Sequence, residues 1–209
     1  MKAYLLTAAF GYLLGSIPFG YILFRIFQGA DIRQRGSGNI GATNVARSSP
    51  GLGALTLVLD AGKGYLAVYL AVMLFNRTPY GHADGMFTLM SVASLFAITG
   101  HVFPVWLKFR GGKGVATGLG SFIPIAPKAI LVAMGVFAAI VLGYRYISLG
   151  SITAVALFPL IAWLLQSYGN SPLALIFIAA ASGLIIAKHY QNIRRLLSGT
   201  EPRFHLRRR

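Results

Sequence analysis

Cysteine is absent from this 209-residue chain, and acidic residues are scarce: Asp and Glu together number 4, against 19 Lys and Arg. The lack of cysteine excludes a disulfide framework, a thiolate nucleophile and a cysteine-based metal site, and it leaves the redox compartment undetermined. Four carboxylates also provide little material for a two-carboxylate mechanism. Charged residues make up only 11% of the chain, whereas a soluble domain is about one quarter charged. The scarcity of charge therefore excludes an ordinary soluble domain.

The chain contains instead long apolar runs, and 56% of its residues are hydrophobic. A helix needs about 20 mostly apolar residues to cross a bilayer. The runs predict seven transmembrane helices, at approximately residues 3-25, 51-75, 86-107, 115-127, 129-144, 149-168 and 172-189. The fourth and fifth are short or broken, because Pro124, Pro127 and Lys128 interrupt that stretch. The sequence thus predicts an all-α polytopic membrane protein with a single integral-membrane domain over residues 1-209.

The distribution of basic residues decides whether residues 114–144 cross the membrane once or twice, because cytoplasmic loops carry an excess of Lys and Arg. With one crossing, Arg145 and the basic residues from Lys188 onward lie opposite those of the first two loops. With two crossings, all of these loops share one side. We therefore predict two crossings, with the N-terminus outside and the C-terminus in the cytoplasm. The alternative is that residues 114–144 form a re-entrant hairpin. The predicted cytoplasmic loops are residues 26-50, 108-114, 145-148 and 190-209. The basic residues left on the opposite side are Lys2, Arg77 and Lys128.

The first loop combines glycines with neutral hydrogen-bonding side chains and an arginine. Backbone N–H groups beside glycine approach a ligand closely and form anion-binding concavities, and arginine grips phosphate oxygens with two N–H groups. The expected phosphate-binding residues are Gly36, Ser37, Gly38, Asn39, Gly41, Thr43, Asn44 and Arg47. The glycine spacing also matches the dinucleotide fingerprint, but no strand precedes it and no βαβ unit surrounds it. The simpler interpretation is a flexible basic loop that only orients the protein.

The second loop places Lys113 at the start of a span, among glycines at positions 111, 112 and 114. It is not a P-loop, because Gly114 rather than Ser or Thr follows the lysine. The lysine charge, the free N–H groups and the positive end of a helix dipole still favour an anion site. The glycines assigned to that site are Gly111, Gly112 and Gly114. The third loop adds Ser148 and Ser151, for which ordinary helix capping is the more common role.

The segment after the last span predicts a helix that continues out of the membrane. His189 and Asn192 lie three residues apart and share one face of such a helix, so we assign both to the site. The simpler interpretation, an anchor among lipid headgroups, suits the terminal arginines 207–209.

Within the spans, Asp60 and Lys63 are also three residues apart. Each would cost about 2.5–3.5 kcal/mol if unpaired at the centre of a span, so the spacing predicts an ion pair. Such a pair indicates either a functional role or a structural contact that holds the span against its neighbours. His101 has the same two interpretations, since it either reaches a cavity at headgroup depth or packs between helices.

Several enzyme motifs are absent: the His-x4-Asp motif of common glycerolipid acyltransferases, the Gly-x-Ser-x-Gly elbow, and a His and carboxylate cluster with metal-ligand spacing. We therefore expect no metal and no cofactor. What remains is a set of anion-binding loops with few candidate bases. Such a site suits phosphate-bearing substrates whose reaction depends on positioning and charge stabilisation.

Together these loops resemble the PlsY family, the acyl-phosphate-dependent glycerol-3-phosphate acyltransferases of bacteria. The resemblance covers nearly the whole chain, and its motifs occur in the expected order. The matching segments are Gly15-Ser-Ile-Pro-Phe-Gly20, Gly36-Ser-Gly-Asn-Ile-Gly-Ala-Thr-Asn44 with Arg47, Gly100-His-Val-Phe-Pro104, Phe109-Arg-Gly-Gly-Lys-Gly-Val-Ala-Thr117, Ser148-Leu-Gly-Ser151, and His189-x-x-Asn-Ile-x-Arg-Leu with Gly199-x-Glu201.

The resemblance implies a multi-pass enzyme of the bacterial inner membrane whose active site faces the cytoplasm. It implies transfer of a fatty acyl group from acyl phosphate to the 1-hydroxyl of sn-glycerol 3-phosphate. The products are lysophosphatidic acid and phosphate, in the first acylation step of phospholipid biosynthesis. It further implies no CoA, no carrier protein and no metal. The expected partners are both substrates and membrane lipid, with a soluble enzyme that makes acyl phosphate as a further candidate and no nucleic acid.

For this sequence we expect that Arg47, Ser37 and the glycine-rich N–H groups, together with Lys113, clamp two phosphates, one on each substrate. His189 and Asn192 then position glycerol 3-phosphate, and Ser151 orients a phosphate or the carbonyl group. The remaining candidates, without an assigned role, are Asp60, Lys63, His101 and Glu201.

Two other functions fit part of the pattern. A transporter or channel for an anionic solute would explain the broken spans, but the anion-binding residues gather on one face and the sequence has no internal repeat. A scaffold that holds anionic lipid would leave the glycines and the neutral hydrogen-bonding side chains unexplained.

Overall fold

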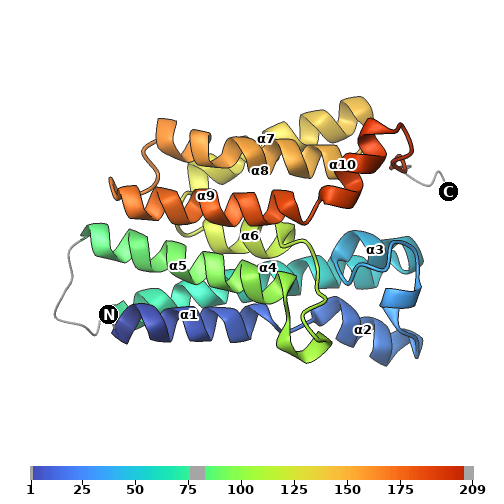
Figure 1. The fold of residues 1–209 in the computed structure, drawn as a ribbon, viewed down its shortest axis with the longest axis horizontal. Helices are drawn as coiled ribbons and strands as arrows, with labels where there is room; N and C mark the ends of the chain where they lie inside the picture. Colours follow the sequence, from blue (N-terminus) through green and yellow to red (C-terminus); the bar gives the residue numbers. More distant parts are fainter. Residues whose placement is uncertain (1, 76–82, 205–209) are drawn as a thin grey trace.

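The computed structural model describes residues 2–75 and 83–204, and every regular element in these ranges is helical (Figure 1). Arg77 and residues 205–209 lie outside the described residues. The predicted all-helical membrane architecture is confirmed. The α-helices are α1 (Lys2–Gly15), α2 (Phe19–Gln28), α3 (Ala42–Ser48), α4 (Pro50–Phe75), α5 (Ala83–Val102), α6 (Val115–Phe122), α7 (Pro127–Tyr144), α8 (Ile147–Leu164), α9 (Pro172–Ala187) and α10 (Tyr190–Leu197). Two 3-10 turns, η1 (Ile32–Gln34) and η2 (Val105–Leu107), complete the order.

Five described segments are long and apolar enough to cross a membrane: Lys2–Gln28, Pro50–Leu74, Gly85–Leu107, Pro127–Tyr144 and Ile147–Leu164. A sixth consists of α9 with α10, which are bent by 57° against each other. The predicted fourth span is the exception, because α6 has only 8 residues and extends about 12 Å. It therefore reaches only part of the way across a hydrocarbon core of about 30 Å.

The first and last predicted spans are interrupted where the sequence suggested continuous helices. The first divides at Pro18 into α1 and α2, because proline has no N–H to donate. At the other end, the sequence predicted one helix running from the last span through His189, and this prediction is wrong. Helix α9 ends at Ala187 and α10 begins at Tyr190. No proline lies at this second break, so local sequence gave no warning. Asn192 is buried on α10, beyond this bend.

Small residues allow two helix pairs to approach closely, as is common in membrane bundles. A Cβ on Gly15 would collide with the backbone of Ala97, and one on Gly100 would collide with Tyr12, so α1 lies directly against α5. Similarly, Gly64 lies against the carbonyl of Thr117 and joins α4 to α6. The short α6 is thus held in the interior of the bundle.

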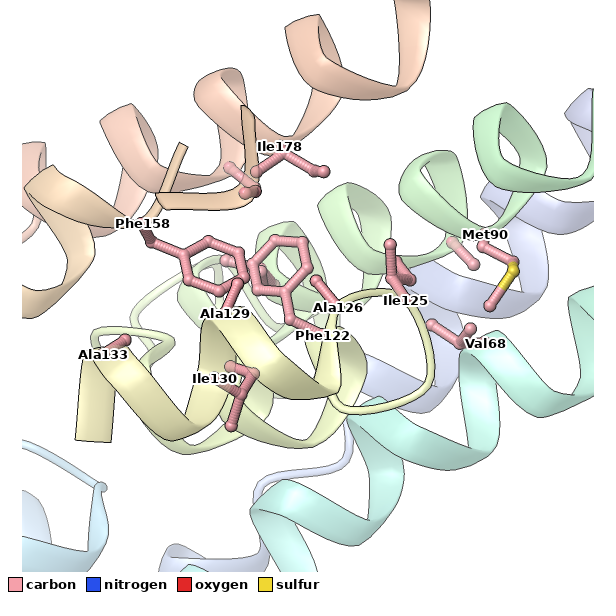
Figure 2. Packing of buried hydrophobic residues seen from close by; sticks show 14 of the residues in the cluster. Val68, Met90, Phe122, Ile125, Ala126, Ala129, Ile130, Ala133, Phe158 and Ile178 are labelled. Carbon is pink, nitrogen blue, oxygen red and sulfur yellow. The ribbon is translucent and has the colours of Figure 1, made fainter. Parts of the chain in front are cut away.

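Buried side chains around α6 form the main core (Figure 2). The rings of Phe122 and Phe158 have centroids 4.8 Å apart and join α6 to α8. Large apolar side chains also cover the outside of the bundle; Leu131 and Leu142 are 70% and 80% exposed on α7. Exposed apolar side chains in such number indicate a lipid-facing surface.

The loops that carry the candidate site residues share one end of the bundle. Figure 1 shows the segment from α2 to α4, the segment from α5 to α6, the turn between α7 and α8, and α10 at this end. The start of α1 and the turn between α8 and α9 lie at the opposite end. A separate apolar cluster supports the first loop, with Phe24, Ile32, Ile40, Val45 and Leu107 buried in it. The end that carries the site is therefore an ordered part of the fold.

Candidate active site

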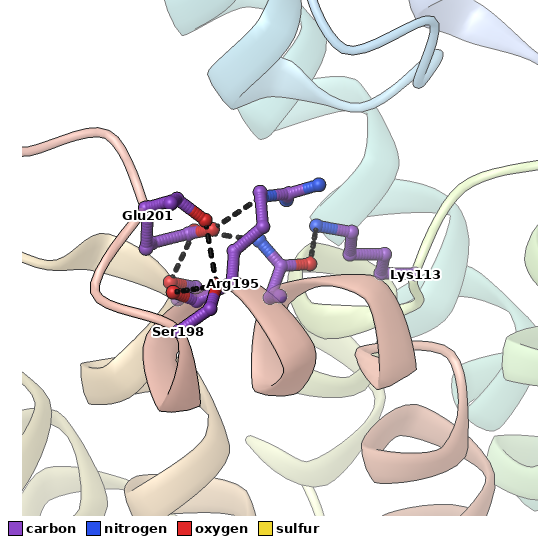
Figure 3. Close-up of polar contacts among 7 residues, drawn as sticks. Lys113, Arg195, Ser198 and Glu201 are labelled. Atoms are coloured by element: carbon purple, nitrogen blue, oxygen red, sulfur yellow. Dashed lines mark hydrogen bonds and ion pairs between the residues drawn. The ribbon is translucent and has the colours of Figure 1, made fainter.

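A network of hydrogen bonds centred on Glu201 joins three parts of the chain (Figure 3). Its carboxylate accepts from the Ser148 hydroxyl at 2.6 Å, the Asn192 amide at 2.7 Å and the Arg195 Nε at 2.7 Å. On its other side, Asn192 Oδ1 accepts from Lys113 Nζ at 2.5 Å. Glu201 therefore orients the Asn192 amide, and Asn192 in turn holds Lys113.

The C-terminal segment reaches this position by folding back over the turn between α7 and α8. The Phe204 N–H donates to the Arg145 carbonyl at 2.6 Å, and the Arg203 guanidinium lies 5.6 Å from the centroid of the Tyr146 ring. Burial acts to raise the pKa of Glu201, but the bonds from Ser148 and its other donors outweigh it and hold that pKa below its ordinary value. The carboxylate is consequently ionised at neutral pH.

Lys113 lies in a tight loop that follows η2 and leads into α6. Gly114 caps α6 with a φ of 88°, a conformation that favours glycine. Burial lowers the pKa of Lys113 to about 8; the Glu201 charge opposes this shift, whereas Arg195 and Arg47 add to it. The ammonium is thus poorly solvated and close to its titration point, which makes it a receptive site for an anion.

His189 occupies the break between α9 and α10, after the end of the apolar helix α9. Its Nδ1 lies 2.8 Å from the Ile185 carbonyl, so the neutral ring carries its proton on Nδ1 and leaves the Nε2 lone pair free to accept. Burial lowers the pKa of His189 to about 4, and the charge of Lys113 adds to that effect. The imidazole is therefore neutral at pH 7, and its Nε2 can accept a hydrogen bond.

Asn44 organises the glycine-rich first loop from within. Its Oδ1 accepts from the Ser37 N–H at 2.9 Å, and its Nδ2 donates to the carbonyls of Arg35 at 3.0 Å and Asn39 at 2.8 Å. Asn39 makes a similar internal bond, since its Oδ1 accepts from the Gly41 N–H at 2.7 Å. Both polar atoms of the Asn44 side chain and the Oδ1 of Asn39 are thus engaged with backbone groups, which fixes the shape of the loop.

Other first-loop residues present free groups at the surface. Ser37, Thr43 and Arg47 are exposed, and Arg47 is close enough to Lys113 to depress its pKa. Gly38 has a φ of 70° and turns the chain under Arg35, whose carbonyl accepts its N–H at 2.9 Å. This face of the loop is available to an anionic ligand.

The structure distributes the remaining predicted residues unevenly. Ser148 joins the Glu201 network, whereas the Ser151 hydroxyl bonds to the Ile147 carbonyl of its own helix at 2.9 Å. The ion pair expected from the spacing of Asp60 and Lys63 is present, with 2.8 Å between Nζ and Oδ1. The sequence did not assign Arg195 to the site, although its i,i+3 spacing from Asn192 was a usable signal.

A helical membrane bundle with lysine, amide and imidazole groups gathered at one end has the make-up of a membrane enzyme that handles phosphate-bearing substrates. Comparison with known proteins makes the class specific. The family described as glycerol-3-phosphate acyltransferase matches residues 5–199. The chain therefore belongs to the glycerol-3-phosphate acyltransferase family, and this excludes the alternatives of an anion transporter and a lipid-binding scaffold.

Relatives and solved structures agree with that family. Glycerol-3-phosphate acyltransferases from Trichlorobacter lovleyi and Syntrophotalea carbinolica are 47% and 43% identical, each over 98% of this chain and 99% of the relative. The crystal structure of PlsY, an integral membrane glycerol 3-phosphate acyltransferase, in its glycerol 3-phosphate form has a TM-score of 0.86 at 38% identity, covering 97% of this chain and 96% of PlsY. Its lysophosphatidic acid form gives a TM-score of 0.83 at the same identity, covering 97% and 95%.

Proposed function

We propose that this acyltransferase takes its acyl group from acyl phosphate and transfers it to the 1-hydroxyl of glycerol 3-phosphate. The observation that carries this proposal is the hydrogen-bonded connection from Glu201 through Asn192 to Lys113, which sets a cation at the end of the bundle within electrostatic reach of the exposed Arg47. PlsY has been solved in a glycerol 3-phosphate form and in a lysophosphatidic acid form. These molecules are the acceptor and the acylated product of the proposed reaction.

Lys113 and Arg47 are the proposed clamp for the two substrate phosphates. Burial is the main cause of the lowered pKa of Lys113, and the repulsion between Lys113 and the cations Arg195 and Arg47 adds to it in the free enzyme. A bound dianionic phosphate would relieve this repulsion, and the site should therefore bind phosphate in preference to remaining filled with water. Positioning and charge stabilisation of this kind provide much of the acceleration in phosphate-dependent reactions.

His189 is the proposed acceptor for the hydroxyl of glycerol 3-phosphate. The hydroxyl oxygen attacks the acyl carbonyl carbon and forms the ester bond, while the bond from that carbon to the phosphate oxygen breaks. The hydroxyl proton leaves with the released phosphate, so all atoms are accounted for. An imidazole with a pKa of about 4 is a weak base, and its role is to orient the hydroxyl through Nε2.

The proposed arrangement has seven passages, with α6 and α7 forming the fourth and fifth and the site facing the cytoplasm of a bacterial inner membrane. The shared end of the basic loops in Figure 1 supports this orientation. A reporter fused after Lys128 tests it, since the proposal requires the reporter to lie outside. Membrane lipid surrounds the bundle in this arrangement, and a soluble enzyme that makes acyl phosphate would approach from the cytoplasmic side.

Purified protein incubated with labelled glycerol 3-phosphate tests the donor. Acyl phosphate should give lysophosphatidic acid and one equivalent of phosphate, and a chelator should leave the rate unchanged. Activity with acyl-CoA in place of acyl phosphate, or a requirement for a divalent ion, would contradict the proposal.

Substitution of the clamp tests the assigned residues. Lys113→Met and Arg47→Met should each reduce kcat/KM at least about a hundredfold, with the protein still folded in detergent. Arg194→Met is the matched control, because Arg194 is exposed on α10 and contributes nothing to the Glu201 network; its rate should equal that of the parent.

A further inference from the structure

Three ionisable side chains form a second buried cluster, inside the bundle and separate from the Glu201 network. Asp60 and Lys63 lie on α4 and His101 on α5, with exposures of 1%, 4% and 4%. Lys63 Nζ is 2.8 Å from Asp60 Oδ1, and His101 Nδ1 is 3.6 Å from the same oxygen. Buried charges such as those of Asp60 and Lys63 are costly even when they are paired, so the cluster requires an explanation beyond packing.

One side of the cluster fixes the break in the first span. The Lys63 ammonium donates to the Ile17 carbonyl at 2.7 Å, and that carbonyl also accepts the Phe19 N–H at 3.1 Å. Pro18 has no N–H with which to continue the helix. Lys63 therefore supplies a donor at the point where the junction of α1 and α2 lies against α4.

The other side of the cluster contacts the glycine loop that carries Lys113. The Gly112 N–H donates to the His101 carbonyl at 3.0 Å, and the Gly111 N–H donates to the Val102 carbonyl at 3.2 Å. The His101 imidazole fills the space beside Gly112 so completely that a Cβ on Gly112 would overlap its Nε2. The loop thus packs directly against the His101 ring, and no side chain fits between Gly112 and the ring.

We propose that Asp60, Lys63 and His101 are positioning residues for the acyl transfer. Lys63 pairs with Asp60, and Asp60 lies beside the His101 ring. Gly112 is set directly against Nε2 of that ring. Because Lys113 follows Gly112 directly, the position of the ring determines where the Lys113 ammonium meets substrate. This inference rests on the proposed role of Lys113 in the phosphate clamp.

A double-mutant cycle between His101 and Gly112 tests the proposal in the purified full-length protein. Gly112→Ala should lower kcat/KM for glycerol 3-phosphate about a hundredfold, because a displacement of about 1 Å costs that much. His101→Ala should lower it about tenfold. The double variant should recover about tenfold relative to Gly112→Ala alone, since the added methyl group occupies the space that the ring vacates. Independent losses that multiply in the double variant would overturn the proposal.

A folding measurement separates positioning from simple stabilisation. We expect His101→Ala to remain folded in detergent with a reduced kcat/KM per folded molecule; a lower melting temperature with unchanged kcat/KM would overturn the proposal. If His101→Ala does not fold, His101→Asn replaces it in the cycle with the same expectation. Gly62→Ala is the matched control on α4, because nothing lies within 4 Å of the added Cβ, and it should leave the rate unchanged.

The Lys113→Met variant in the same assay distinguishes a failure of the phosphate clamp from a failure of the positioning proposal. If this variant stays active, the phosphate clamp is wrong and the positioning proposal falls with it. If it is inactive and the His101 cycle is additive, only the positioning proposal fails. Coupling in the cycle together with inactive Lys113→Met supports both.

Discussion

The pKa of Lys113 predicts how the rate of this enzyme depends on pH. With a pKa of about 8, the free enzyme is mostly charged at pH 7 and retains only about a tenth of its Lys113 charge at pH 9. Because the proposed clamp needs the ammonium, kcat/KM for glycerol 3-phosphate should fall about tenfold per pH unit above pH 8. The direction is fixed by the group: a lysine loses its charge as the pH rises through its pKa.

The bound enzyme should titrate differently from the free enzyme. A dianionic phosphate beside Lys113 favours its charged form and raises its pKa, so the fall in kcat should begin at a higher pH than the fall in kcat/KM. Radiolabelled glycerol 3-phosphate, assayed between pH 7 and 9.5, measures both parameters. His189, with a pKa of about 4, does not titrate in this range.

Lys113→Arg provides the decisive comparison, since arginine stays protonated throughout this pH range. If this variant retains measurable activity, its kcat/KM should be flat up to pH 9.5. A parent profile that is flat above pH 8, or a Lys113→Arg profile that falls in parallel with the parent, would refute the assignment. The stability of acyl phosphate at each pH is the necessary control, measured without enzyme.

Three further predictions concern the framework of the site. Glu201→Gln should lower kcat/KM about tenfold, because a neutral amide cannot accept from all three donors at once; a rate equal to that of the parent would show that the network is dispensable. The ionised Glu201 stabilises the C-terminal segment above the ordinary pKa of about 4.3, and this contribution is lost as the pH falls through the lower folded pKa. The protection of the amides in residues 199–204 against hydrogen exchange, relative to their intrinsic rates, should therefore decrease below about pH 4, and unchanged protection would contradict this. Gly120→Leu should destabilise the bundle by about 1–3 kcal/mol, since a Cβ there meets the Ala61 backbone, whereas Gly62→Leu should not; equal melting temperatures would refute the close packing of α4 and α6.

Local patterns predicted those parts of the fold and site that depend on short-range chemistry. Apolar runs located the helices that begin near residues 50, 127, 147 and 172. The three-residue spacing of Asp60 and Lys63 predicted their ion pair, because neighbours on a helix face are set by helix geometry alone. The same logic failed for His189, since the helix breaks there without any local signal.

The roles within the polar loops depended on distant contacts. From the sequence, Asn44, Asn39 and Ser37 were all predicted to bind phosphate. In the structure the amide groups of the two asparagines bond to backbone within the loop, whereas Ser37 is exposed. Glu201 had only a motif match, and its central position follows from the way the last described residues fold back over Arg145. Hydrogen bonds across more than 50 residues, such as that of Ser148 with Glu201, leave no periodic trace in a sequence.

By itself, the sequence determined the membrane class, the shared face of the basic loops and the anionic character of the ligand. These properties follow from composition and from the cost of placing charge in lipid, which act on every residue regardless of the fold. Only the tertiary structure decided which polar group meets which, because one carboxylate and one amide gain their roles from partners on other helices. The few acidic residues illustrate this division: their scarcity defined the class of protein, and the positions of Asp60 and Glu201 within the fold connect them to the Lys113 loop.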